Sequence, residues 1–233
     1  MTGSIILAKG VSRKIPHKNM ADFCGKPLLY WTIKQSIESK NIHKTFVSTE
    51  DNYIAEYCKN TFPEITIIKR PEMLIPTGIS WEMVWSHAIE EIKKEFDIDT
   101  FVSLCIANPV RRSYDIDRAI STYWDNNHEG NMVKGCLFSA CIENDLRLWN
   151  KDLRSGHTFS YPNGRNKMGE YYRENESIYV IDVKGFEYYK MRYWGNPSVY
   201  IMPYWASSTI DIIEDLKLCE LIFKYFILKE KET

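Results

Sequence analysis

Residues 4–19 read SIILAKGVSRKIPHKN, a short apolar run that passes directly into a strongly basic segment. The apolar part, 4–8, has the length and composition of a buried strand. The next ten residues, 9–18, carry four lysine or arginine side chains and one histidine, and Gly10 allows the backbone to turn there. Backbone N–H groups of such a loop can surround phosphate groups while Lys and Arg neutralise their charge.

Short apolar runs and amphipathic segments alternate outward from this stretch. We expect strands at 4–8, 44–49, 65–69, 100–106, 132–142, 177–183 and 198–202, and helices at 28–40, 54–59, 81–96, 114–124 and 213–228. This order predicts an α/β fold, a Rossmann-like three-layer sandwich with a mostly parallel central sheet. Loops that follow parallel strands meet at one edge of such a sheet, where ligands bind. The basic loop is therefore a candidate phosphate site, and spacing alone leaves a solvated basic loop as the alternative.

Two well-known phosphate motifs are missing after the first strand. No Gly-Lys-Ser/Thr triplet follows, so the loop is not a Walker loop. No GxGxxG follows either, which disfavours a dinucleotide-dependent oxidoreductase. Later in the chain, residues 143–170 are polar and lack a clear period, and they predict an inserted arm within one domain that spans 1–233.

Composition and charge are those of an ordinary globular chain. Its 233 residues are 44% hydrophobic and 26% charged, with a formal net charge of −1, so neither nucleic acid nor an acidic membrane is an expected partner. The six cysteines form no CxxC pair, which favours reduced thiols over disulfides or a zinc site. The amino terminus shows no signal-peptide pattern, and no apolar run approaches about 20 residues. A soluble cytoplasmic protein is expected.

Residues 5–19, IILAKGVSRKIPHKN, resemble the signature of the acylneuraminate cytidylyltransferases, or CMP-sialic acid synthetases, roughly I-I-x-A-R-x-x-S-K-G-I-P-x-K-N. The matching positions are Ala8, Gly10, Ser12, Ile15, Pro16, Lys18 and Asn19, and Lys9 and Arg13 keep the charge. Val11 and Lys14 replace small residues. The resemblance continues through GKPLL at 25–29, VSTED at 47–51, KRP at 69–71 and PVR at 109–111.

The resemblance implies a nucleotidyltransferase domain whose basic loop binds the triphosphate of CTP. The catalytic cations would be Lys9, Arg13 and Lys18. The other nucleotide-binding residues of the loop would be Ala8, Gly10, Ser12 and Asn19. Arg70 and Ser80 would hold the cytosine. Thr77, Gly78 and Ile79 stand where the family has Asp-Thr-Ala, which leaves the choice between cytosine and uracil open.

The same resemblance implies an acceptor site. LCIANPVR at 104–111 aligns with the family's LQPTSPLR, so Cys105 replaces the glutamine that touches the sugar. A thiol cannot supply both the donor and the acceptor of a carboxamide, which indicates a changed acceptor and not a nucleophilic cysteine. The remaining acceptor residues would be Arg165, Arg173, Asn175 and Tyr179. A guanidinium fork suits a carboxylate, and a tyrosine ring suits the face of a sugar. For the two arginines, ion pairing to Glu170, Glu174 or Glu176 is the alternative.

The metal motif of the family is only half present. Where the family ends its sheet with I-D-x-D, this chain has IDII at 210–213 and keeps Asp211 alone. Mg²⁺ takes many of its ligands from phosphates and water, so one carboxylate can suffice. The reaction implied is attack by an acceptor hydroxyl on the α-phosphorus of CTP with release of pyrophosphate, and either His17 or a metal-bound hydroxyl could take the proton.

Two readings of the function remain beside CMP transfer to a sialic acid-like nonulosonic or octulosonic acid. The altered motifs allow a cytidylyltransferase for another acidic acceptor, such as a phosphonate. They also allow a non-catalytic nucleotide-binding homologue. A homodimer is expected because family members pair through the arm, in which Leu148, Trp149, Phe159 and Tyr161 offer apolar anchors.

Overall fold

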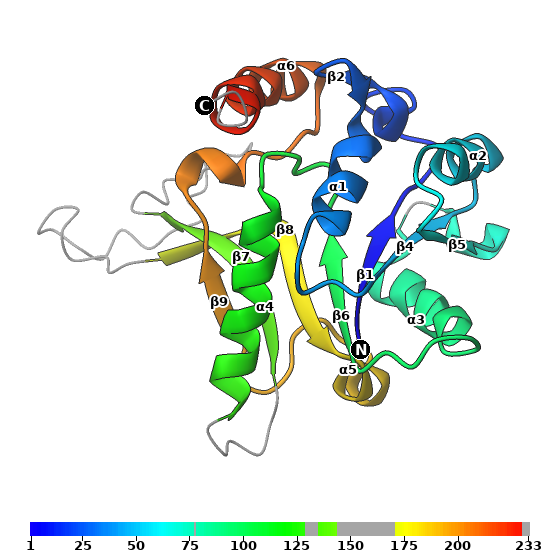
Figure 1. Ribbon diagram of the computed structural model, residues 1–233, viewed down its shortest axis with the longest axis vertical. Coiled ribbons are helices and arrows are strands. Elements are labelled where there is room, and N and C mark those ends of the chain that lie inside the picture. The colour runs from blue at the N-terminus through cyan, green and yellow to red at the C-terminus, as the bar shows by residue number, and fades with distance from the viewer. Residues whose placement is uncertain (77, 129–134, 144–170, 230–233) are drawn as a thin grey trace, which may run out of the picture.

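The computed structural model describes residues 1–76, 78–128, 135–143 and 171–229 (Figure 1). The strands are β1 (Thr2–Leu7), β2 (Asp22–Phe23), β3 (Lys26–Pro27), β4 (Lys44–Thr49), β5 (Thr66–Lys69), β6 (Thr100–Leu104), β7 (Cys136–Glu143), β8 (Tyr171–Asp182) and β9 (Ser198–Ile201). The α-helices are α1 (Leu28–Ile37), α2 (Asn52–Thr61), α3 (Trp81–Ile92), α4 (Ser113–His128), α5 (Val183–Tyr189) and α6 (Ile213–Phe223). Short 3₁₀-helices lie at η1 (Lys18–Met20), η2 (Glu72–Leu74) and η4 (Tyr204–Ser207), and a π-helix, η5 (Lys224–Leu228), continues α6.

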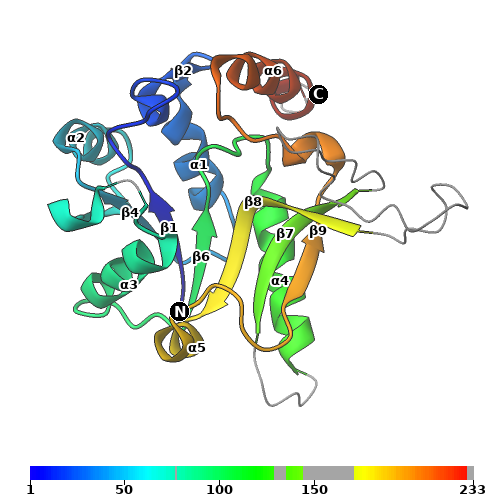
Figure 2. The same cartoon turned by 180° about the vertical axis from the view of Figure 1, so that it is seen from behind.

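A seven-stranded sheet forms the middle layer, in the order β5-β4-β1-β6-β8-β7-β9. Parallel pairs join β5, β4, β1 and β6, and another joins β7 to β9. β8 runs antiparallel to both of its neighbours. Helices cover both faces of this sheet (Figures 1 and 2), which confirms the expected α/β sandwich with a mostly parallel sheet. The loops after β1, β4, β5 and β6 consequently leave from one edge.

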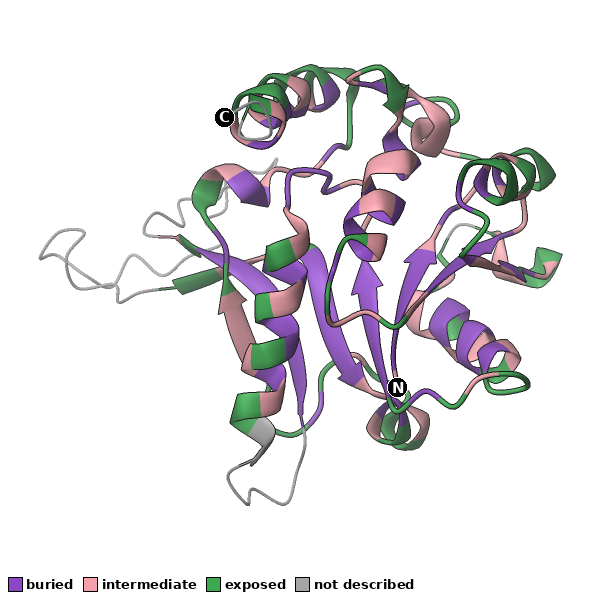
Figure 3. Cartoon of the chain, viewed as in Figure 1, coloured by how far each residue is buried: buried purple, intermediate pink, exposed green. Residues whose placement is uncertain are grey.

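Two hydrophobic cores lie on the two faces of the sheet, because successive side chains of a strand point in opposite directions. Ile6 and Val102 belong to the core shared with α1, α4 and α6. Their neighbours Ile5 and Phe101 belong to the core shared with α3 and α5. The central strands are therefore buried on both sides (Figure 3). This explains why they appear in the sequence as continuous apolar runs.

The structure corrects several expected element boundaries. β8 begins at Tyr171 and not at 177, because its polar first part pairs with β7 from Glu143 to Ala140. The helix α5 was not expected, and it starts where the Asp182 carboxylate accepts a hydrogen bond from the Gly185 amide at 2.7 Å. α3 ends at Ile92 instead of 96, although Phe96 still packs edge-on against Phe46. β7 begins at Cys136, and residues 132–134 of the expected strand lie outside the described residues.

Three other expectations concern the proposed arm, the cysteines and membrane-spanning segments. The proposed arm, apart from residue 143, lies outside the described residues. Each of the six cysteines is a free thiol. None of the helices in the described ranges combines the length and the apolar character needed to cross a bilayer.

Trp85 is expected to carry a large share of the packing beneath the sheet. Its side chain is 0% exposed and makes edge-on contacts with Trp81, Phe101, Tyr179 and Phe186. Trp85→Ala should therefore lower the free energy of unfolding by about 3–5 kcal/mol in urea denaturation. Tyr53→Ala removes a ring that is 67% exposed and should cost no more than about 0.5 kcal/mol. Equal losses in the two variants would contradict this account of the core.

Candidate active site

Hydrogen bonds to its backbone hold the basic loop after β1 in place. The Gly10 amide donates to Glu50 Oε1 at 2.7 Å, and Asn19 Nδ2 donates to the Lys9 carbonyl at 2.8 Å. A Cβ atom on Gly10 would lie 2.3 Å from Asp51 Oδ2, so only glycine fits this close approach. The side chains of Arg13 and Lys14 are exposed. Its conformation is thus set by β4 and α2 next to it.

Asp211 faces this loop from the far end of the chain. Lys14 Nζ lies 3.0 Å from Asp211 Oδ2, and Lys18 Nζ lies 3.8 Å from Oδ1. Lys18 Nζ also donates to the Ile210 carbonyl at 2.7 Å, which ties the loop to the segment before α6. The hydrogen bond from Lys14 lowers the pKa of the Asp211 carboxyl, which keeps it ionised at neutral pH. The structure brings together residues that the sequence places almost 200 positions apart.

A cavity of about 330 Å³ lies between the basic loop and the segment before α3. Its lining residues are Lys9, Val11, Ser12, Arg13, Lys14, Lys18, Pro76, Gly78, Ile79 and Asp211. Four of these side chains are cationic and one is anionic, which gives the cavity a strong local positive field in a chain of net charge −1. A polyanion such as a triphosphate is the ligand that this lining suits best.

Ser80 and Cys105 occupy the neighbouring region. Ser80 is the N-cap of α3, and its Oγ accepts a hydrogen bond from the Met83 amide at 3.4 Å. Cys105 lines a small cavity of about 70 Å³ together with Leu7, Trp81, Ser103, Leu104 and Ile106. Desolvation raises the pKa of the Cys105 thiol, so the thiolate needed for a nucleophile is disfavoured.

Arg70, which is expected to hold the cytosine, is not among the residues that line the cationic cavity. Its side chain is buried, with Nη2 donating to the Ser48 carbonyl at 2.7 Å. Nη1 lies 3.3 Å from Glu50 Oε2. Desolvation lowers the pKa of Arg70, and the charge of Glu50 opposes that shift. The guanidinium is thus engaged inside the protein.

The acceptor residues expected on β8 have structural partners instead. Asn175 is 2% exposed, and its Oδ1 accepts from Ser139 Oγ at 2.6 Å while its Nδ2 donates to Ser207 Oγ at 2.9 Å. Tyr179 is 0% exposed, and its hydroxyl donates to Glu174. Both side chains are thus buried and hydrogen-bonded within the protein, and their expected contact with a sugar stays a prediction.

The two arginines of the expected acceptor set differ in outcome. Arg173 Nε lies 3.2 Å from Glu143 Oε2, and its guanidinium lies over the Tyr204 ring at 5.2 Å. Ion pairing, the alternative expected for Arg173, is therefore present. Its partner is Glu143, however, and not one of the glutamates near it on β8. Arg165 lies outside the described residues.

Arg192 and Glu176 were missed by the sequence interpretation. Arg192 Nε lies 2.6 Å from Glu82 Oε1, and its guanidinium lies 5.0 Å from the Trp81 ring centroid. Glu176 has a φ of 59°, which is unusual for a residue with a side chain. Desolvation and the nearby charges of Glu174 and Asp211 raise the pKa of Glu176. No motif or periodicity marked either residue, since both depend on contacts distant in sequence.

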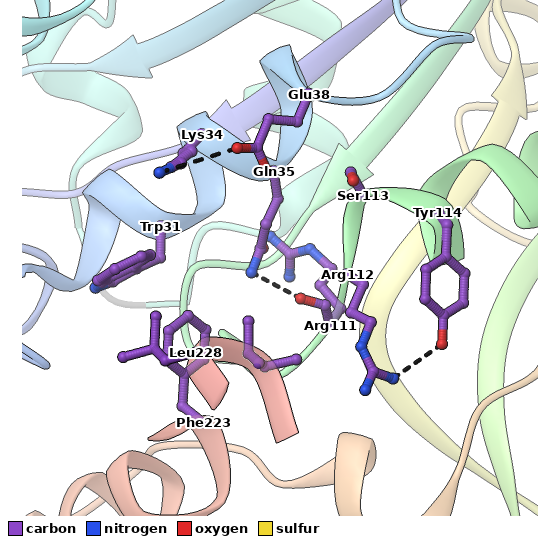
Figure 4. Close-up of a pocket in the computed structure, with 11 residues that line it drawn as sticks. Trp31, Lys34, Gln35, Glu38, Arg111, Arg112, Ser113, Tyr114, Phe223 and Leu228 are labelled. Carbon is purple, nitrogen blue, oxygen red and sulfur yellow. Dashed lines mark hydrogen bonds and ion pairs between the residues drawn. The ribbon is translucent and has the colours of Figure 1, made fainter. Parts of the chain in front are cut away.

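Another cavity, of about 300 Å³, lies between α1, the start of α4, the end of α6 and η5 (Figure 4). Trp31, Phe223 and Leu228 give it an apolar wall. Polar contacts between its lining residues include the hydrogen bond from Gln35 Nε2 to the Arg111 carbonyl at 2.8 Å. It contains no residue of the basic loop, so the candidate active site is the cationic cavity.

Known proteins similar to this chain include cytidylyltransferases. One chain similar over 98% of this one, at 26% identity, is the N-acylneuraminate cytidylyltransferase of Streptococcus agalactiae, of whose length the match covers 55%. Another is the pseudaminic acid cytidylyltransferase of Campylobacter jejuni, at 24% identity over 94% of this chain and 95% of that protein. This chain therefore spans only about half the length of the first of these relatives.

Solved structures share the fold. The structure of CMP:2-keto-3-deoxy-manno-octonic acid synthetase complexed with CTP superposes with a TM-score of 0.69 at 13% identity, covering 100% of this chain and 99% of that one. A 4-diphosphocytidyl-2C-methyl-D-erythritol synthase superposes with a TM-score of 0.67 at 11% identity, covering 95% and 98%. The family model described as cytidylyltransferase matches residues 4–192. With most of its length matched, including the basic loop, this chain belongs to the cytidylyltransferase family.

Proposed function

We propose that this protein transfers CMP from CTP to an acidic sugar, a sialic acid-like nonulosonic or octulosonic acid, with release of pyrophosphate. The observation that carries the proposal is the cavity in which Lys9, Arg13 and Lys18 face Asp211. Membership of the cytidylyltransferase family supports CTP as the donor. The names of the relatives, which act on N-acylneuraminate and pseudaminic acid, support an acidic sugar as the acceptor.

In the proposed reaction, the triphosphate lies along the basic loop. An acceptor hydroxyl attacks the α-phosphorus, a new P–O bond forms, and the bond to the bridging oxygen of pyrophosphate breaks. Lys9, Arg13 and Lys18 stabilise the charge on the phosphates, so catalysis rests on positioning and electrostatics. His17 is exposed and is not among the residues that line the cavity, which makes it a poor candidate for the base.

Mg²⁺ fits this site as a partner of the bound triphosphate. Within the described residues, no group of three His, Cys, Asp or Glu side chains could hold a metal. Mg²⁺ is commonly held by one or two carboxylates together with substrate phosphates, and the ionised Asp211 at the edge of the cavity provides one. When bound, the ion would neutralise charge on the phosphates. Lys14, now paired with Asp211, would then be free to contact phosphate oxygens.

A different acidic acceptor, such as a phosphonate, is the second candidate. The observation that favours it is Cys105, whose thiol stands in the small cavity beside Trp81 where the family resemblance implies a carboxamide. A thiol forms only weak hydrogen bonds, so a hydroxyl-rich sugar would lose contacts there. We also propose a cytoplasmic location, which is consistent with the six free thiols.

Pyrophosphate release tests the transferase. With CTP and Mg²⁺, we expect release that depends on one member of a panel of 3-deoxy-2-keto acid sugars. Asp211→Asn should lower kcat/KM at least about 100-fold, because it removes the carboxylate that faces the phosphates. Glu214→Gln changes the same charge on an exposed neighbour and should leave the rate within about threefold.

Two outcomes would contradict the proposal. Release with a phosphonate but with none of the acid sugars would favour the second candidate. Binding of CTP without release for any acceptor would indicate a non-catalytic nucleotide-binding homologue.

We propose further that the protein is a homodimer. Exposed apolar side chains lie near the ends of β7 and β9, at the start of β8 and in η4, and they are Ile142, Tyr171, Tyr172, Ile201 and Tyr204. Pairing of β7 with β8 and β9 places them near one another. A contiguous exposed apolar patch commonly marks an interface, and a second copy of the chain is the occupant consistent with the family resemblance.

Light scattering at micromolar concentration tests the dimer. The wild-type protein should have twice the monomer mass, whereas Ile201→Glu should be a monomer, because the patch cannot bury an unpaired carboxylate. Tyr53→Glu places the same charge on α2, away from the patch, and should remain dimeric. A monomeric wild-type protein would contradict the proposal.

A further inference from the structure

Glu50 connects the basic loop to Arg70. This glutamate directly follows β4, and its two carboxylate oxygens face in different directions. Oε1 accepts the hydrogen bond from the Gly10 amide at 2.7 Å, and Oε2 lies 3.3 Å from Arg70 Nη1. The Glu50 side chain is 10% exposed and that of Arg70 3%, so water screens this pair only weakly.

Both ends of this connection are anchored to the sheet. The Arg70 amide donates to the Thr49 carbonyl at 2.9 Å, and the Arg70 side chain donates to the Ser48 carbonyl through Nη2 and to Ser48 Oγ through Nε. On the other side, Gly10 is confined by Asp51, which leaves no room for a Cβ atom. Glu50 therefore has one fixed geometry in which it can serve both partners.

We infer that Glu50 and Arg70 are a positioning pair: Glu50 fixes the backbone of the phosphate-binding loop, and Arg70 cancels the Glu50 charge that would otherwise repel a triphosphate. This inference rests on the proposed function, in which the loop holds the triphosphate of CTP. It assigns no role to Arg70 in reading the base. It also implies that the Gly10 amide, already bonded to Glu50, is not a phosphate ligand.

The electrostatics of the pair predict a signature in triphosphate binding that can be measured in charge variants. A carboxylate of low exposure beside a polyphosphate is unfavourable unless a cation neutralises it. Removing only the arginine leaves that carboxylate uncompensated, which is more damaging than removing both charges. Arg70→Met should therefore weaken triphosphate binding although its side chain does not line the cavity. Replacing Glu50 by glutamine in the same chain should restore the binding, because the amide oxygen can still accept from Gly10.

Calorimetric titration of four proteins tests this signature: wild type, Arg70→Met, Glu50→Gln and the double variant. The ligands are CTP, UTP and inorganic tripolyphosphate, which has no base. We expect Arg70→Met to weaken all three by a similar factor of about ten or more, with the CTP-to-UTP ratio unchanged. The double variant should recover to within about threefold of the wild type. Glu56→Gln, an exposed change on α2, is the matched control and should leave all affinities unchanged.

Two results would overturn the inference. A loss confined to CTP, with tripolyphosphate unaffected, would mean that Arg70 reads the base. Failure of the double variant to recover, in a protein whose circular dichroism is native, would mean that Arg70 acts directly on the ligand and not through Glu50.

Amide exchange of Gly10, measured by nuclear magnetic resonance without any ligand, tests whether Glu50 holds the loop, independently of the proposed function. Glu50→Ala should speed exchange at Gly10 by about tenfold or more, and Glu56→Gln should not. If the wild type bound neither CTP nor tripolyphosphate, the proposed function would fail, while exchange at Gly10 would still decide whether Glu50 holds the loop. Unchanged exchange at Gly10 in Glu50→Ala would show that Glu50 does not hold the loop.

Discussion

At Gly10 the backbone passes so close to the Asp51 carboxylate that no side chain can be accommodated, and the rest of the site depends on this contact. It exists because β1 and β4 are parallel neighbours, so that the ends of both strands reach the same edge of the sheet. Asp51 is at the same time the N-cap of α2, accepting from the Tyr53 amide at 2.8 Å. The loop, the strand ends and the helix start are thus one rigid unit.

The charged side chains of the site are held in position by this rigid unit. A chain with a net charge of −1 concentrates four cationic side chains around one cavity and sets Asp211 against them. Lys18 is held by the Ile210 carbonyl, which fixes its ammonium group before any ligand arrives. Such preorganisation lowers the cost of reorganising dipoles and charges during a reaction. The two ends of the chain therefore contribute jointly to the electrostatics of one site.

The fold could be predicted from sequence because buried strands and amphipathic helices leave periodic patterns, and the basic loop because it combines charge with its place after β1. The direction of individual side chains left no such pattern in the sequence. Tyr179 matches a motif position, yet it is buried in the core beside α3. Arg70 likewise matches in type but pairs with Glu50. β8 was placed too late because its first residues are polar and are held by pairing with β7, which no local pattern records.

The position of β8 between β6 and β7 has a consequence for synthesis on the ribosome. When β6 has left the exit tunnel, one of its edges has no partner, because that partner is β8, which begins only at Tyr171. β6 is buried along its whole length in the finished protein, so the nascent chain displays an apolar strand with open hydrogen-bonding groups. Until β8 inserts, premature pairing between neighbouring nascent chains is the principal hazard, and protection by chaperones matters most in that interval.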